Sequence, residues 1–446
     1  MWLQLTASNS QTDALVAQRP NARVAVLLIG SLRGDGRCAV GVEERSRGAA
    51  GAVLWRRACV LALGALALQS LCALPSAHAR RVTTRASSEL AGYTDSMQVH
   101  VASPTIGASV GDEIAGWSLG ARYLVDVVSA ASVDIIATAS PRWMEVRQVG
   151  SIDAGYKHGD LSLGAAGTVS NEPDYLAGSA ALMASLELFD KNLTPFVGAR
   201  YGHDDVGRRG LAREHWQVLQ RGGLQLGLTF VINRFVIASA QLDMDLERGY
   251  LAKPYRYIPL FDSGQGSQVP AGASPDLVNA LRVDERPVDR LPTDRDRYAL
   301  TGRIAGRWRS TTLRMDERVY RDSWGLWAST TELRVLTDAG PRVLLWPHLR
   351  VHAQSSVQFW QRAYERVELA DGSRGVPRYR TGDRELSALQ TTTLGLGCKL
   401  RLSHPAQSPW FLQVQIDAAY THFFDALYVT ERWSLFSALG LSAQWN

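Results

Sequence analysis

Cysteine is nearly absent from the larger part of this 446-residue chain. Of its four cysteines, Cys38, Cys59 and Cys72 lie near the N-terminus and only Cys398 lies beyond. A single cysteine excludes a disulfide framework and a cysteine-based metal site in that larger part. Long apolar runs are also missing after residue 74, so no later segment is expected to cross a membrane as a helix.

Excess charge of one sign is missing as well. The formal net charge is +5, and eight arginines against four acids fall in residues 1–79, which leaves 40 basic and 39 acidic residues in the rest. A nearly neutral chain beyond residue 79 argues against a nucleic-acid partner.

The N-terminal region has the order of a secretory signal. Arg56 and Arg57 precede an apolar run at 58–74, and Ala77, His78 and Ala79 follow it. A basic segment, an apolar segment and an A-x-A site predict a signal peptide over residues 51–79, cleaved after Ala79. An uncleaved anchor helix is the alternative. We expect residues 1–50 to be a spurious or unstructured extension and residues 80–446 to be the exported protein.

What the chain has in abundance is alternation of apolar and polar residues. In the stretch ASAQLDMDLE (238–247), Leu242, Met244 and Leu246 alternate with Asp243, Asp245 and Glu247. Because successive side chains of a strand point to opposite faces, such a strand has one apolar and one charged face. The pattern recurs in about sixteen segments, many long enough to cross a bilayer: 83–94, 96–107, 115–127, 140–157, 160–170, 175–189, 193–204, 221–232, 234–248, 297–309, 311–322, 326–337, 341–354, 387–403, 409–422 and 432–446.

The connections between these segments alternate between short and long. Segments 204–214, 249–296, 355–386 and 423–432 are long, whereas those between them span only a few residues. Short turns on one side and long loops on the other are typical of outer-membrane barrels. We therefore predict an all-β, antiparallel transmembrane β-barrel of about sixteen strands in the bacterial outer membrane. Fourteen strands, or a soluble many-stranded β protein, are the alternatives.

Two residues depart from the pattern. Pro347 falls inside a predicted strand, where it cannot donate a hydrogen bond, so we expect a bulge there. Glu317 falls on the lipid-facing side between Met315 and Val319, which predicts either a bulged strand or a position near the rim.

The polar face of the predicted barrel is rich in charge. A barrel of this size is too wide for side chains to fill, so we expect an aqueous channel or a lumen plugged by loops. In the channel hypothesis, opposed charges in the lumen orient polar solutes, although lateral pairing of neighbouring charges is an alternative. The candidate lumen charges are Asp243, Asp245, Glu247, Arg303, Arg307, Arg314, Asp316, Arg318, Glu332, Arg334 and Arg350.

One motif stands out near the third predicted strand. Residues 126–132 read D-V-V-S-A-A-S, with Asp126, Ser129 and Ser132 as its polar members. This resembles an uncharacterised bacterial outer-membrane β-barrel family, a domain of unknown function, with a D-x-x-S-[GA]-A-S motif. The resemblance implies compartment and fold but no activity. We interpret the motif either as a loop that folds into the barrel mouth or as a constriction or ligand site.

Sites for catalysis and metals are not evident. His348 and His352 stand about 13 Å apart on a strand, too far to share a metal. His422 and Ser437 are too far apart for a nucleophile and its base, with Ser437 expected near Ala418. We expect no enzyme activity, no metal and no cofactor. The expected partners are outer-membrane lipid and a small solute; the oligomeric state stays open. A second hypothesis is a plugged structural or assembly barrel whose long loops bind a partner or surface polymer.

Overall fold

The protein forms a closed antiparallel barrel of sixteen strands, as the alternation predicts. The computed structural model describes residues 82–130, 143–368, 370, 372, 374–404 and 407–445. Strand β1 pairs with both β2 and β20 and so closes the sheet. The alternative of fourteen strands is wrong. The predicted extension, signal peptide and cleavage site lie outside the described residues.

Each predicted segment corresponds to one barrel strand. The barrel strands are β1 (Val82–Asp95), β2 (His100–Asp112), β3 (Trp117–Ala130), β4 (Trp143–His158), β5 (Leu161–Glu172), β6 (Tyr175–Leu186), β7 (Leu193–Val206), β8 (Gln217–Asn233), β9 (Val236–Gly249), β11 (Asp294–Trp308), β12 (Thr311–Asp322), β13 (Trp327–Asp338), β14 (Val343–Gln354), β18 (Leu389–Arg401), β19 (Trp410–Phe423) and β20 (Glu431–Trp445).

The outer face of the barrel is apolar and exposed. Leu300 and Ile304 of β11, for example, expose 57% and 48% of their surface. Closure pairs every strand on both sides, which a membrane-spanning sheet needs because lipid cannot hydrogen-bond to the backbone. No helix in the described residues is long and apolar enough to span a membrane.

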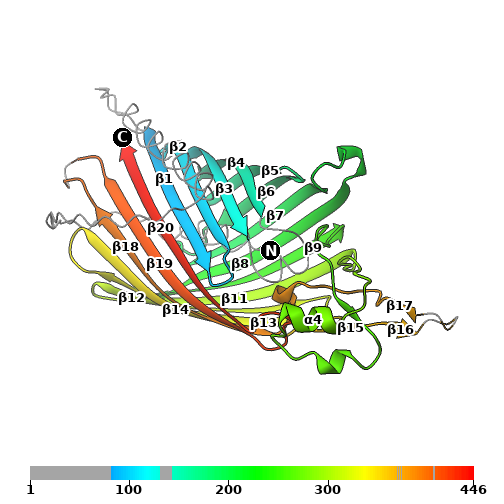
Figure 1. The fold of residues 1–446 in the computed structure, drawn as a ribbon. Helices are drawn as coiled ribbons and strands as arrows, with labels where there is room; N and C mark the ends of the chain where they lie inside the picture. The colour runs from blue at the N-terminus through cyan, green and yellow to red at the C-terminus, as the bar shows by residue number, and fades with distance from the viewer. Residues whose placement is uncertain are drawn as a thin grey trace, which may run out of the picture.

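The two ends of the barrel differ in their connections. Tight turns join β4 to β5, β8 to β9 and β11 to β12 at the end where the C-terminus lies, whereas the long connections gather at the opposite end (Figure 1). The turn before β3 needs glycine: Gly116 has φ +79°, and a Cβ there would lie 2.0 Å from the Lys157 carbonyl oxygen.

The long connections fold into a compact unit, here called the cap: the described residues of 250–293, 355–388 and 424–430. Strand β10 (Leu260–Phe261) pairs in parallel with β15 (Tyr364–Glu365), and the short helix α4 (Pro275–Leu281) packs its Val278 against Phe261 and Val269. β16 (Val367–Glu368) pairs with β17 (Arg374–Gly375) farther out (Figure 1). One apolar cluster, around Val357 and Leu386, also packs against Tyr320 of β12 and Ala328 of β13, so the cap contacts the inner wall near the strand ends.

The bulge predicted at Pro347 is wrong. Pairing between β13 and β14 runs from Arg334↔His348 to Thr337↔Leu345 without a change of register. Only the pairs between these two are missing, because proline lacks the N–H that the ladder needs. On its other side Pro347 pairs with Leu396 in regular order.

Glu317 lies on the outer face without a bulge and away from the rim. Strand β12 keeps one register with both neighbours, and Glu317 is four residues from Arg321, which pairs with Tyr298 and Trp327 near the strand end. Its carboxylate accepts hydrogen bonds from the hydroxyls of Ser329 and Thr331 on β13. Neighbouring hydroxyls therefore solvate this outward carboxylate.

Candidate functional site: the charged lumen

The inner face of the barrel carries the charged residues. The strand register places all the candidate lumen charges on the face opposite to the exposed apolar side chains. Strand alternation alone accounts for this placement, because the charged residues of any one strand stand an even number of positions apart.

The three acids of β9 each have a basic partner. Arg318 of β12 reaches Asp243 at 2.9 Å, and Arg297 of β11 reaches Glu247 at 2.8 Å. Arg200 of β7 bonds Asp245 of β9 across the intervening strand.

That last pair depends on a glycine between the two strands. Gly223 of β8 stands opposite both partners, and a Cβ there would lie 2.5 Å from the side chain of Arg200. Sequence reasoning missed Arg200 and Arg297. The signal that could have found Arg200 is the glycine opposite it.

Strands β11 to β13 carry a second group of ion pairs. Asp316 accepts bonds from Arg303 at 2.9 Å and from Arg314 at 2.6 Å. Arg334 bonds Glu332 at 2.6 Å, and Arg307 bonds Asp338 near the turn end. Neighbouring charges in this wall are thus largely paired along the sheet.

Strand β14 contributes one arginine and two histidines to the inner face. Arg350 stands opposite Glu332 and makes no ion pair in the described part of the chain. His352 bonds the Thr330 hydroxyl at 2.7 Å. His348 lies across Gly395 of β18, and its Nε2 is 3.3 Å from Asp417 on β19.

Summed over the wall, the inward charges divide the barrel into two halves. In β1–β9 the acids outnumber the bases, with Glu89, Asp95, Asp126, Glu145, Asp153, Glu172, Asp204, Asp243, Asp245 and Glu247 against Arg85, Arg122, Arg147, Lys157, Arg200 and Arg221. In β11–β14 and β18–β20 the bases prevail, with Arg295, Arg297, Arg303, Arg307, Arg314, Arg318, Arg334, Arg350, Lys399, Arg401 and Arg432 against Asp316, Asp322, Glu332, Asp338 and Asp417. A field therefore crosses the lumen from the second half to the first.

The motif near the third strand is part of the wall. Asp126 is 3% exposed, accepts a hydrogen bond from the Ser103 hydroxyl at 2.5 Å and pairs with Arg147 at 2.9 Å. Ser129 faces outward, opposite His100. Ser132 lies outside the described residues, as does the loop that would fold into the mouth.

One acidic group could hold a metal ion. Ligand oxygens of Glu145, Glu172 and Asp174 lie within 4.8 Å of one another at the cap end of β4 and β5. Asp174 also accepts a hydrogen bond from the Tyr255 hydroxyl of the cap. Acidic groups of this kind are common without an ion, so the cluster by itself assigns none.

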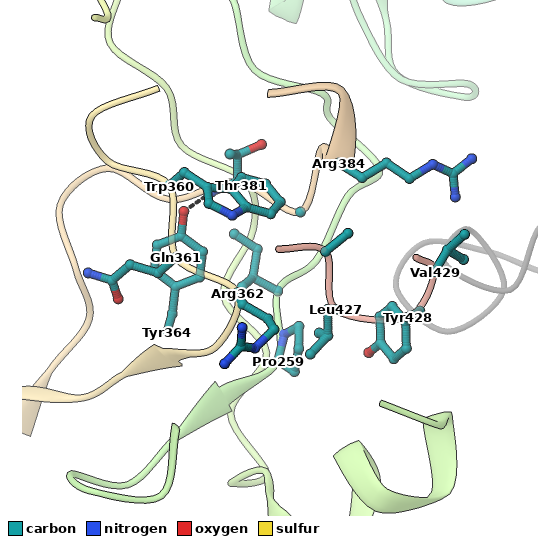
Figure 2. Close-up of a pocket in the computed structure, with 13 residues that line it drawn as sticks. Pro259, Trp360, Gln361, Arg362, Tyr364, Thr381, Arg384, Leu427, Tyr428 and Val429 are labelled. Carbon is teal, nitrogen blue, oxygen red and sulfur yellow. Dashed lines mark hydrogen bonds between the residues drawn. The ribbon is translucent and has the colours of Figure 1, made fainter. Parts of the chain in front are cut away.

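The cap contains a narrow pocket between its segments. Figure 2 shows Trp360, Arg362 and Tyr364 on one side and Leu427 and Tyr428 on the other. The Thr381 backbone N–H donates to the Tyr364 hydroxyl at 3.0 Å (Figure 2), and Arg362 bonds Asp425. The first bond lies within the β14–β18 connection, and the second ties that connection to the β19–β20 connection.

Buried carboxyls lie behind this pocket. Burial raises the pKa of the Asp289 carboxyl to about 6, against the opposing effect of the Arg256 guanidinium. Burial alone would raise the pKa of Asp383 too, but Arg256, 2.9 Å away, holds it well below its usual range. The Gly382 N–H donates to Asp289 at 3.2 Å.

The cap is fixed to the inner wall of the barrel mouth. Glu385 pairs with Arg432 of β20 at 2.7 Å. The Gln354 side chain at the end of β14 donates to the Glu385 and Ser387 carbonyls, each at 2.8 Å. These bonds fix the cap to the basic half of the barrel, and Tyr255 links it to Asp174 in the acidic half.

A closed sheet with an apolar exterior and a charged interior defines a transmembrane β-barrel of the outer-membrane type. The chain belongs to the family described as "Protein of unknown function (DUF3570)", whose model matches residues 107–422. The resemblance inferred from the sequence is confirmed for the family, while the motif at 126–132 stays a prediction. No curated protein matches the chain significantly.

Solved outer-membrane barrels are among the structures that are similar to this chain. The siderophore receptor PirA from Pseudomonas aeruginosa is 12% identical with a TM-score of 0.38, over 78% of this chain and 57% of the receptor. OccD3 (OpdP) from the same organism is 9% identical with a TM-score of 0.41, over 82% and 91% of the two chains. CdiB from Acinetobacter baumannii is 10% identical with a TM-score of 0.40, over 81% and 60%. Likenesses this distant specify no substrate.

Proposed function

We propose that this protein is a passive channel that admits small polar solutes across the bacterial outer membrane. Export through a signal peptide cleaved after Ala79 is part of the proposal. The observation that carries it is the division of the lumen into an acidic and a basic half. A closed barrel of sixteen strands leaves an interior too wide for its own side chains to fill.

Exposure of the inner charges supports an aqueous lumen. Glu89, Arg122, Asp153 and Arg200 all face inward, and all are exposed. Charged side chains that stay exposed on a barrel wall are stabilised by water. Rows of opposite charge facing one another select polar solutes.

The test is the conductance of the purified protein in a planar bilayer. We expect steady, long-lived openings in potassium chloride solution, with a conductance that scales with salt concentration. Inserted protein that leaves the bilayer insulating would contradict the channel and favour a plugged barrel.

The folded cap favours a second candidate, a structural or assembly barrel that binds a partner or surface polymer through its long connections. Its apolar clusters and β10–β15 pairing give it a fixed shape that a partner could recognise. Deletion of residues 264–290 distinguishes the two functions. In the second case the deletion abolishes partner binding, whereas in the channel it only alters the conductance.

A further inference from the structure

The basic half contains an arrangement that strand pairing does not explain by itself. Between β12 and β13, Asp316 stands opposite Glu332, and one rung farther along Arg314 stands opposite Arg334. Like charges directly opposite one another destabilise a sheet. The two acids are compensated by arginines on β11, β12 and β13, which use part of their donors on the carboxylates.

Arg350 of β14 adds a positive charge beside these two acids, and His348 stands two positions from it on the same inner face. Arg350 extends the rung of Asp316 and Glu332, and it makes no ion pair in the described residues because Glu332 bonds Arg334 instead. His348 extends the rung of Arg314 and Arg334. Around the two carboxylates, guanidinium groups are therefore in excess.

His348 is held in a fixed place beside these arginines. Its side chain is 6% exposed and lies against Gly395, where a Cβ would stand 2.2 Å from the imidazole. Nε2 faces Asp417, whereas Nδ1 is buried and has no hydrogen-bond partner in the described part of the protein. A buried polar nitrogen without a partner costs free energy unless a ligand or water bonds it.

The chemistry that fits this cluster is a small oxyanion. Planar guanidinium forks bind carboxylates and phosphates with two parallel hydrogen bonds. An anion between Arg334 and Arg350 would also offset the excess positive charge at mid-height of the wall. The acidic half opposite, with Asp153 of β4 across the lumen from β13, keeps the anion near the arginines.

We propose that Arg334 and Arg350, flanked by His348, form a binding site for the carboxylate or phosphate group of a small solute that passes through the lumen. The passage of that solute rests on the proposed channel function, whereas the site itself is a property of the folded barrel. In a channel such a site must be weak enough to release its solute.

Binding is tested on the purified protein in detergent by titration calorimetry with sodium succinate and, separately, with inorganic phosphate. We expect saturable binding of one or both oxyanions. Arg350→Gln should weaken it at least tenfold, because it removes a fork that the fold does not use for an ion pair. The matched control is Arg122→Gln, an exposed inward arginine of β3 in the acidic half, for which we expect less than a twofold change.

If Arg350→Gln and Arg122→Gln weaken the binding of both oxyanions equally, the proposed site is wrong. Such a result would indicate general attraction of anions to the charged protein. Absence of saturable binding of either oxyanion to the wild-type protein would also overturn the proposed site. Since calorimetry needs no ion current, the outcome is separate from conductance. Saturable binding without conductance would support the oxyanion site and contradict the channel function. Conductance without binding would support the channel function and contradict the oxyanion site.

Discussion

At the scale of the residue, the most unusual group is the carboxylate of Glu317 on the lipid-facing surface. Ionisable side chains facing lipid are costly, and the cost grows toward the bilayer midplane. Here the hydroxyls of Ser329 and Thr331 bond both carboxylate oxygens. The sequence shows that Glu317 departs from the apolar pattern of the outer face. It does not show which groups bond the carboxylate, because the two hydroxyls lie on the next strand and their position depends on the register.

Replacement of this carboxylate by an apolar side chain should stabilise the barrel. We expect Glu317→Leu to raise the free energy of unfolding by about 1 kcal/mol, since the charge leaves the lipid face and the two hydroxyls can bond strand carbonyls instead. Urea unfolding in lipid vesicles measures this. The matched control is Glu332→Leu on the inner face, which breaks the ion pair with Arg334 and should destabilise. A Glu317→Leu protein less stable than the wild type would refute the prediction.

At the scale of the element, strand count, strand faces and the alternation of turns and loops follow from the sequence. A period of two repeated over sixteen segments allows few other arrangements. The cap does not follow in the same way. Its β10–β15 pair joins residues about a hundred positions apart, through segments of two residues each. Such contacts have no periodicity, so nothing in the local sequence predicts them.

Acid should stabilise the cap through Asp289. Its pKa is raised to about 6, so the buried carboxyl is protonated below that value and charged above it. A raised folded-state pKa gives stability that is present below the unfolded value near 4 and is lost as the pH rises through about 6. Asp383, whose pKa is lowered, contributes stability above about pH 4 and loses it in stronger acid. We therefore expect the cap to be most stable near pH 4 and to lose stability as the pH rises through about 6.

Hydrogen exchange of cap amides at pH 5.5 and 7.5, corrected for intrinsic exchange rates, measures this difference. We expect Asp289→Asn to raise the stability of the cap at pH 7.5 by on the order of 2 kcal/mol and to remove most of the difference between the two pH values. Asp284, an exposed acid of the same connection, provides the control. Asp284→Asn should leave the difference in cap stability between the two pH values unchanged. Equal protection of the Asp289→Asn and wild-type caps at pH 7.5 would contradict the assignment.

At the scale of the whole molecule, the division of the lumen arises from the sum of many inward residues. Sequence alternation identifies the charges of β9 and of β11–β14, but their partners depend on which strands become neighbours and on glycines between them. Arg200 reaches Asp245 only because Gly223 leaves room. Of the charges of β1–β5, the sequence singled out only Asp126, since the inward residues there are mostly small and the acids are scattered.

The field across the lumen should set the ion selectivity of the channel. Arg303 and Arg307 belong to the basic half. Asp316 keeps its bond to Arg314 when Arg303 is removed, whereas Asp338 loses its partner Arg307 but is exposed enough to be solvated by water. We expect Arg303→Ala with Arg307→Ala to lower the chloride-to-potassium permeability ratio by about twofold, because two positive charges leave the lumen wall. Reversal potentials across a potassium chloride gradient measure the ratio. Arg209→Ala with Arg213→Ala, exposed residues of the β7–β8 connection, removes the same charge outside the barrel wall and should leave the ratio within the scatter of the wild type. If both pairs of substitutions change the ratio equally, overall protein charge rather than the basic half controls the selectivity.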